Sequence, residues 1–126
     1  MISLFFIFLA AVCNSLMDTC SHHYEQSVLT RFGKKQFWDA SVSWKNKYVD
    51  WDNNDRRRTR LFGVFIKPVS LTDAWHLFKR LMLIFLGIAV ISYNTITQYV
   101  IVDFCLVLLT WNTIFHLFYH KILIQK

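Results

Sequence analysis

Hydrophobic residues fill three long stretches of the chain, which are separated by one extensive polar region and one short link. The stretches run from about residue 2 to 22, from about 71 to 94 and from about 98 to 121. Each is close to the roughly 20 residues that an α-helix needs to cross the hydrocarbon core of a bilayer. The pattern predicts an all-α integral membrane protein, a single membrane domain over residues 1–126 with three transmembrane helices.

The second stretch has the least regular beginning, because its uninterrupted apolar part starts only after Lys79 and Arg80. Long basic side chains can extend along a helix toward the membrane surface, so these two residues are compatible with a span. Ser70 followed by Asp73 resembles a capping box, and Pro68 upstream fits a chain about to enter a helix. We therefore expect the second helix to begin near Ser70.

The first stretch resembles a signal peptide in its position and its apolar composition. No Lys or Arg precedes the apolar run, however, and Val12 before Cys13 makes a poor lipoprotein cleavage motif. Polar residues also continue one helical face beyond the region where cleavage would occur, from Asn14 through Asp18 to His22. We therefore expect a retained transmembrane helix.

Each apolar stretch also carries one row of polar residues at helical spacing, and residues three or four apart share one helix face. Ionisable groups are costly in hydrocarbon, so we expect each row to turn toward the protein interior. Three crossings place the end of the first helix, the start of the second and the end of the third on one side of the membrane. The rows are Asn14, Asp18 and His22; Asp73, His76 and Arg80; and Asn112, His116 and His120.

Carboxylates and imidazoles that meet at one depth are the ligands that zinc, iron or manganese takes in proteins. Asp73 is the expected catalytic general base, because a carboxylate at the start of a helix is well held. The alternative is that these side chains only form hydrogen bonds between helices or lie at the membrane surface. The expected metal ligands are Asp18, His22, His76, His116 and His120. Hydrogen bonds from Asn14, His23 and Asn112 are expected to orient these ligands.

The composition supports membrane residence and excludes an ordinary small soluble domain. Of 126 residues, 55% are hydrophobic and 17% are aromatic, and the chain has only three Gly and one Pro. Most basic residues lie between about 24 and 70, whereas the link from 94 to 98 has no charge. By the positive-inside rule we expect the large loop and the C-terminus in the cytoplasm and the N-terminus outside.

The large loop combines basic and aromatic residues, which predicts a segment that lies along the membrane surface. The spacing of the aromatic residues repeatedly places a ring on the same side of this segment, at Trp38, Trp44, Tyr48 and Trp51. A lid over the polar site is the functional alternative to simple anchoring. The basic run Arg56–Arg60 favours anionic headgroups or sets the topology, and nucleic-acid binding is not expected beside three apolar spans.

Other local sequence signals are weaker evidence for a function. Residues 50–54 resemble the start of a calcium loop, but Asp55 replaces the required Gly and Leu61 replaces the required Glu. The three cysteines predict no disulfide framework. Asp103 lies near the opposite end of the third helix, where we expect a solvated carboxylate at the membrane surface.

Three sequence patterns together resemble a family of small, uncharacterised bacterial multi-pass membrane proteins. They are Phe37-Trp38-Asp39, the run from Ser43 to Tyr48 (SWKNKY), and the run from Leu71 to Lys79 (LTDAWHLFK), and Asn14 to Asp18 fits the same pattern. The resemblance covers about the first two thirds of the chain. It implies a bacterial or phage source and residence in a membrane, the bacterial inner membrane, and it supplies no catalytic residue.

The sequence thus favours a small membrane enzyme that uses a bound metal, zinc or iron, to hydrolyse an ester or amide of a lipid-like substrate. With only five histidines, the chain does not match the histidine-rich lipid desaturases and hydroxylases. The rival hypothesis is a non-enzymatic membrane component, either an accessory subunit for a membrane partner or a small pore-forming oligomer. Homo-oligomerisation is expected under both hypotheses, because three spans bury little surface.

Overall fold

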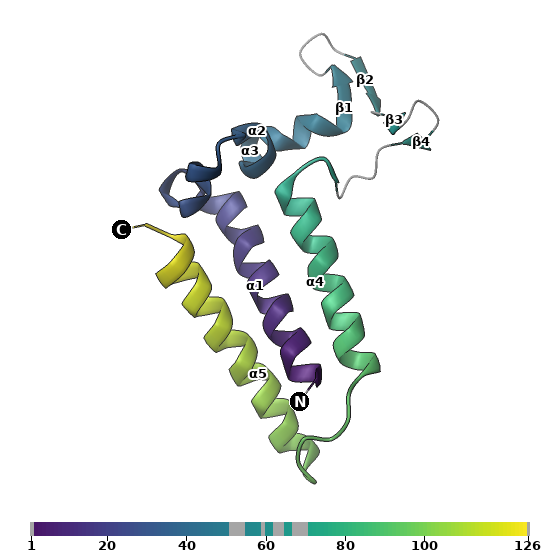
Figure 1. The fold of residues 1–126 in the computed structure, drawn as a ribbon, viewed down its shortest axis with the longest axis vertical. Helices are drawn as coiled ribbons and strands as arrows, with labels where there is room; N and C mark the ends of the chain where they lie inside the picture. The colour runs from purple at the N-terminus through teal and green to yellow at the C-terminus, as the bar shows by residue number, and fades with distance from the viewer. Residues whose placement is uncertain (1, 51–54, 59, 62–64, 67–70, 126) are drawn as a thin grey trace.

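Three long helices form the body of the protein in a computed structural model, and they lie side by side (Figure 1). They are α1 (Ile2–His22), α4 (Ala74–Ile91) and α5 (Val100–Leu117), and α5 continues as a π-helical segment, η5 (Phe118–Leu123). The structure describes residues 2–50, 55–58, 60–61, 65–66 and 71–125. All three helices are long and apolar enough to cross a membrane, which confirms the predicted all-α membrane fold.

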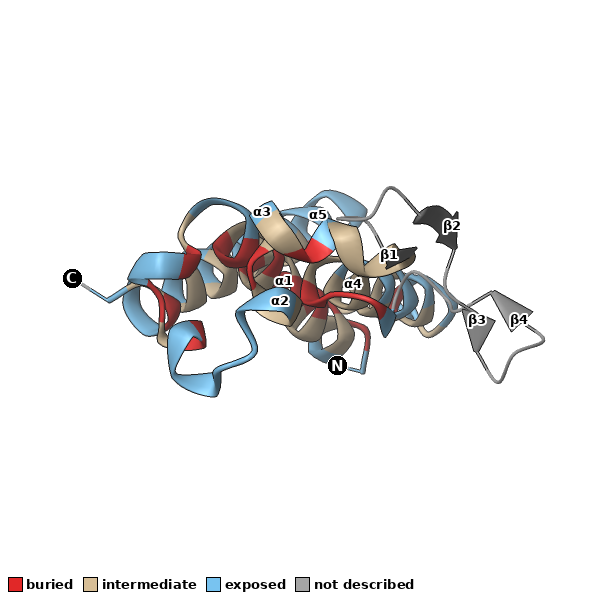
Figure 2. Cartoon of the chain, turned by 90° about the horizontal axis from the view of Figure 1, so that it is seen from above, coloured by how far each residue is buried: buried red, intermediate tan, exposed pale blue. Residues whose placement is uncertain are grey.

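Helix α1 lies between the two other helices and packs against both of them (Figure 1). Its buried positions include Ala10, Ala11, Ser15 and Thr19, each of which is fully buried. Small residues of this kind let neighbouring helix backbones approach closely in a membrane protein. Buried residues accordingly follow α1 and the adjacent part of the loop in Figure 2, whereas few residues of α4 and α5 are buried.

Helix α4 begins at Ala74 and not near Ser70, so the predicted start of the second helix was wrong. Asp73 itself is the N-cap, with an extended backbone and a carboxylate that accepts the backbone N–H of His76. Asp is a preferred N-cap residue because it satisfies one of the free N–H groups of the first turn. Ser70 lies outside the described residues.

The region between α1 and α4 consists of short elements. Among the residues described there, two antiparallel pairs of strands, β1 with β2 and β3 with β4, follow five short helical turns, and none of these strands exceeds four residues. The elements are η1 (Tyr24–Gln26), η2 (Val28–Phe32), α2 (Lys35–Trp38), α3 (Ala40–Ser43), η3 (Trp44–Lys47), β1 (Tyr48–Asp50), β2 (Asp55–Arg58), β3 (Arg60–Leu61) and β4 (Phe65–Ile66). We call the end of the bundle that carries them the loop end.

A small hydrophobic core joins the loop to the ends of all three helices. It contains Cys20 of α1, Leu29 of η2, Ala74 of α4 and Leu123 of η5, together with Tyr24. The C-terminal residues also reach the loop, where Ser27 and Ile124 form an isolated bridge. The first part of the loop therefore caps the bundle.

The aromatic residues of the loop do not share one membrane-facing surface. The ring of Trp38 stacks on Phe78 of α4 with centroids 6.2 Å apart, so it belongs to the packed loop end. Trp44 is 36% exposed. Trp51 lies outside the described residues. The expectation that these rings lie together along the membrane surface is therefore wrong for Trp38.

Asp103 organises the link between α4 and α5. Its side chain is buried and accepts hydrogen bonds from the Tyr93 hydroxyl, the Ile96 N–H, and both the N–H and the hydroxyl of Thr97, at 2.8–2.9 Å. The expectation of a solvated surface carboxylate was wrong. A short polar link can bury a carboxylate when it supplies enough donors, because charge-assisted hydrogen bonds offset the loss of water.

Candidate functional site

Asp73 and His76 form a close pair at the start of α4. Nδ1 of His76 lies 2.9 Å from Oδ1 and 2.8 Å from Oδ2 of Asp73. The Asp73 side chain is 3% exposed, whereas the His76 side chain is 34% exposed. The buried carboxylate thus binds the Nδ1 edge of a histidine that is itself partly exposed.

Asp73 has further hydrogen bonds that limit what it can do chemically. Oδ1 accepts the backbone N–H of His76 at 2.9 Å, and Oδ2 accepts the hydroxyl of Thr72 at 3.0 Å. Both carboxylate oxygens of Asp73 are therefore engaged by donors, which fixes the position of the side chain. The geometry therefore suits Asp73 to orienting His76, and it makes His76 the better candidate for the general base that the sequence assigned to Asp73.

The carboxylate also selects the tautomer of His76. Because an ionised carboxylate can only accept, Nδ1 of a neutral His76 carries the proton and Nε2 keeps its lone pair. No hydrogen bond to Nε2 occurs among the described residues. This is the arrangement of an acid–base histidine, in which a fixed carboxylate orients the ring and stabilises the imidazolium that forms.

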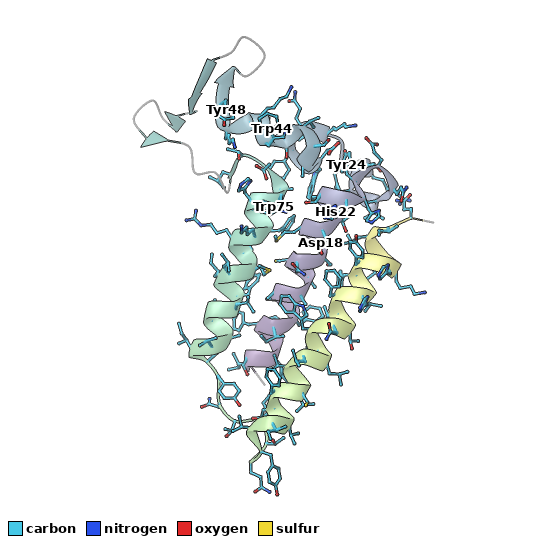
Figure 3. All side chains as sticks on the ribbon, turned by 180° about the vertical axis from the view of Figure 1, so that it is seen from behind. Asp18, His22, Tyr24, Trp44, Tyr48 and Trp75 are labelled. Carbon is cyan, nitrogen blue, oxygen red and sulfur yellow. The ribbon has the colours of Figure 1, made fainter. Side chains whose placement is uncertain are left out.

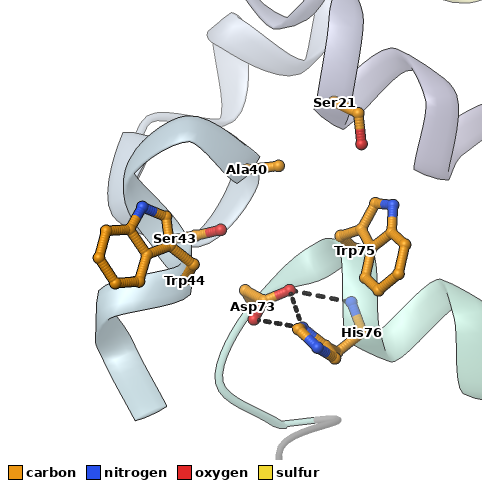
Figure 4. Close-up of a pocket in the computed structure, with 7 residues that line it drawn as sticks. All are labelled: Ser21, Ala40, Ser43, Trp44, Asp73, Trp75 and His76. Atoms are coloured by element: carbon orange, nitrogen blue, oxygen red, sulfur yellow. Dashed lines mark hydrogen bonds and ion pairs between the residues drawn. The ribbon is translucent and has the colours of Figure 1, made fainter. Parts of the chain in front are cut away.

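The pair lines a small open pocket of about 160 Å³ between α1, α3 and α4 (Figure 4). Small-molecule sites usually measure about 300–1,000 Å³, so this pocket holds a headgroup fragment or a single ester group rather than a whole lipid. Two indole rings and two hydroxyl groups contribute to its wall. The lining residues are Ser21, Ala40, Ser43, Trp44, Asp73, Trp75 and His76.

Two local interactions hold the loop beside the pair. The amide of Asn46 donates to the carbonyl oxygen of Thr72 at 3.0 Å and also to that of Gln36, which ties η3 to the start of α4. Asp39 caps α3 by accepting the backbone N–H of Ser41 at 2.9 Å. Together these bonds place the short helix α3 over the N-terminus of α4.

The polar residues of α1 lie at the same end of the bundle, as predicted from the topology. Figure 3 shows Asp18 and His22 on the last turns of α1, with Trp75 at the start of α4. Asp18 is half-buried and His22 is exposed. His22 and His23 line a second pocket of about 260 Å³ that adjoins the first at Ser21.

The second pocket carries a basic residue. Lys35 on its wall is ion-paired with Glu25 and lies 3.6 Å from the Asp39 carboxylate. The hydrogen bond to Glu25 raises the pKa of the Lys35 ammonium, so this side chain stays protonated at neutral pH. The second pocket therefore carries a protonated lysine whose charge is balanced by the carboxylates of Glu25 and Asp39.

The histidines of α5 and η5 do not line either pocket. His116 and His120 stack on each other with ring centroids 5.4 Å apart, and both are exposed, as is Asn112. His23 instead contacts the ring of Tyr119 at 5.6 Å. The polar row of the third helix therefore meets lipid or another protein, and it does not turn inward as expected.

No group of three or more His, Cys, Asp and Glu side chains that could hold a metal ion occurs within the described part of the chain. The expected ligands divide into the Asp73–His76 pair, the α1 residues Asp18 and His22, and the stacked pair on α5. A zinc or iron site made by one copy of the chain stays a prediction that this arrangement does not support. Asn14 is half-buried on α1.

Several residues of the site were not identified from the sequence. Thr72, Asn46 and Ser43 contribute through contacts between segments up to 26 residues apart, which no local pattern specifies. The SWKNKY and LTDAWHLFK runs contain all three, so their polar composition was the available signal.

No protein-family model, no curated protein and no solved structure matches the chain. The resemblance to small bacterial multi-pass membrane proteins therefore stays a prediction.

Proposed function

We propose that this membrane protein is an enzyme that hydrolyses an ester or amide bond of a lipid-like substrate, with His76 as the acid–base residue. The observation that carries the proposal is the contact of His76 Nδ1 with both oxygens of a buried carboxylate, at 2.8 and 2.9 Å. This contact leaves Nε2 as the basic nitrogen of a residue that lines an open pocket.

In the proposed reaction, Nε2 of His76 takes a proton from a water molecule in the pocket while the water oxygen attacks the carbonyl carbon. The imidazolium that forms is stabilised by the Asp73 anion. Collapse of the tetrahedral intermediate breaks the carbonyl carbon bond to the leaving oxygen or nitrogen, which receives the proton from Nε2. The products are a carboxylic acid and an alcohol or amine, and His76 returns to its neutral form.

A lipid-like substrate fits the position and size of the site. The pocket lies at the end of three helices that can cross a membrane, and Trp44 and Trp75 form part of its wall. Indole rings favour the headgroup level of a bilayer. A volume of about 160 Å³ admits the ester region, and the acyl chains would remain in the membrane.

The second candidate is a non-enzymatic membrane component, an accessory subunit or a small pore-forming oligomer. It is favoured by the way in which Asp73 and Asp103 each bind several donors of their own segment, because such carboxylates can be purely structural. Under this hypothesis, Asp73 and His76 only fix the start of α4.

Lipid turnover distinguishes the two candidates. The purified protein is reconstituted in vesicles of phosphatidylethanolamine and phosphatidylglycerol, and released fatty acids and headgroup fragments are measured by mass spectrometry. The proposal expects turnover that falls about 100-fold or more in His76→Gln. Absence of any product with the folded wild-type protein contradicts the enzymatic proposal.

His116→Gln is the matched control, because it makes the same change on α5, away from the pocket. The proposal expects this variant to keep wild-type turnover. Loss of activity in both variants, together with one zinc or iron per chain by elemental analysis, would instead support the metal site predicted from the sequence. The two mechanisms are therefore separated by one set of proteins.

A further inference from the structure

One face of α5 points away from α1 and carries residues spaced alternately three and four apart. Such spacing follows a single face of a helix and is the heptad pattern of helices that pack as coiled coils. The residues on the opposite side of α5, including the buried Asp103, are the more buried ones, and Phe118 contacts Phe8 of α1. The outward face consists of Val102, Cys105, Leu109, Asn112 and His116, all exposed, and we call it the α5 seam.

Asn112 makes the α5 seam unsuitable for contact with lipid. It lies midway along the candidate span Val100–Leu123, where the hydrocarbon is deepest. One N–H of its amide bonds to the Leu108 carbonyl at 3.0 Å, and no described residue bonds to its carbonyl oxygen or its second N–H. Polar groups without partners are costly at this depth, so this face requires a protein neighbour.

His116 adds a second polar group one turn further along. Its ring stacks on His120 and contacts Phe115, and it has no hydrogen bond among the described residues. A neutral imidazole has one donor and one acceptor, and a primary amide has both as well. Each of these side chains can therefore form hydrogen bonds with the same side chain of a second copy.

The topology brings identical residues to the same depth. Two copies inserted in the same orientation place their α5 helices parallel, so Asn112 faces Asn112 and His116 faces His116. A single buried Asn at a seam position is known to fix register and oligomeric state in parallel coiled coils. We propose that two copies of this chain associate through the α5 seam, with Asn112 and His116 forming hydrogen bonds across the twofold axis.

A second copy is preferred over another partner because the polar groups of the α5 seam are self-complementary and carry no charge when histidine is neutral. A partner recognised by charge would require an Asp, Glu, Lys or Arg on this face, and the α5 seam has none. The proposal is independent of the catalytic role of His76, which lies on α4. Disproof of the catalytic role of His76 would leave the proposed dimer unaffected, and the reverse also holds.

Cys105 provides a direct test, because the proposal places the two copies of this exposed thiol close to the twofold axis. A disulfide requires Cα atoms less than about 7 Å apart. The full chain in phosphatidylethanolamine and phosphatidylglycerol vesicles, at high lipid excess, is oxidised with copper phenanthroline. We expect a covalent dimer that is lost in Cys105→Ser, whereas Cys13 and Cys20 are buried and do not contribute.

The matched control moves the thiol to the neighbouring position, in the double variant Cys105→Ser with Phe104→Cys. Phe104 is 61% exposed at the same depth but lies off the α5 seam. We expect little cross-linking from this position. Equal cross-linking at both positions would show random collision and overturn the proposal.

Asn112→Leu tests the hydrogen bonds. Single-molecule photobleaching in vesicles gives the dimer fraction against the protein-to-lipid ratio, and we expect the dissociation constant to rise about fivefold. Phe104→Ala, which changes an exposed residue off the α5 seam, should leave it unchanged. A wild-type chain that stays monomeric at all ratios, or a dimer insensitive to Asn112→Leu, overturns the proposal.

Discussion

The hydroxyl of Tyr93 donates a 2.9 Å hydrogen bond to Oδ2 of Asp103, across the link that joins α4 to α5. The same carboxylate accepts the backbone N–H groups of Ile96 and Thr97, so one side chain fixes both sides of the link. The two outer helices are otherwise held mainly through α1. This cluster therefore sets how α5 follows α4.

Replacement of Asp103 is expected to destabilise the protein more than replacement of Tyr93. Asp103→Ala leaves the N–H groups of Ile96 and Thr97 without their acceptor, whereas Tyr93→Phe removes one donor from a carboxylate that keeps three others. Thermal unfolding in detergent should show a clearly larger drop in Tm for Asp103→Ala. Equal drops would contradict the role of Asp103 as the organising residue.

The same cluster predicts a loss of stability at alkaline pH. The hydrogen bond to Asp103 raises the pKa of Tyr93 above its ordinary value, which is about 10. A raised folded-state pKa gives stability that is complete below about pH 10 and disappears as the pH passes the folded-state value. Unfolding measured from pH 8 to 11 should show this decline, and Tyr93→Phe should make it shallower. An identical decline in the variant would contradict the assignment.

Asp73 is expected to have two separable roles. Asn caps helices about as well as Asp, so Asp73→Asn should preserve stability, whereas Asp73→Ala should lose about 1 kcal/mol. Both variants remove the anion beside His76, so both should lower turnover. Unfolding by denaturant and the lipid assay measure the two roles. Full activity in Asp73→Asn would show that the anion is unnecessary.

Asn46 is expected to hold the loop in place beside the pocket. Asn46→Ala removes the bonds to Gln36 and Thr72 and should cost about 1–2 kcal/mol. Hydrogen exchange should become faster in α3 and at the start of α4, and remain unchanged in the link at Ile96 and Thr97. Uniform acceleration across the chain would indicate global destabilisation instead of a local clamp.

The sequence predicted the three helices because bilayer thickness fixes the length of an apolar span, and hydropathy reports this directly. It did not predict the start of α4, because Ser70 and Asp73 are both good caps and only the fold selects Asp73. The short elements of the loop depend on contacts such as Trp38 with Phe78, which join distant segments. Local patterns contain no information on such contacts.

The inward orientation predicted for the polar rows is wrong for the row on the third helix. Topology places Asp18, His76 and His116 toward one end of the bundle, but it does not specify how each helix is rotated. Because α1 lies between α4 and α5, a row on the far side of α5 faces outward. The small buried residues Ala10 and Ala11 were the available sign that α1 is central.

The most direct test of the proposed function is the tautomer of His76, measured by nitrogen-15 NMR on selectively labelled protein in vesicles near pH 8. The contact with Asp73 predicts a proton on Nδ1 and a basic, unprotonated Nε2, with this preference lost in Asp73→Ala. A proton on Nε2 in the wild-type protein, or an unchanged spectrum in Asp73→Ala, would contradict the acid–base role of His76.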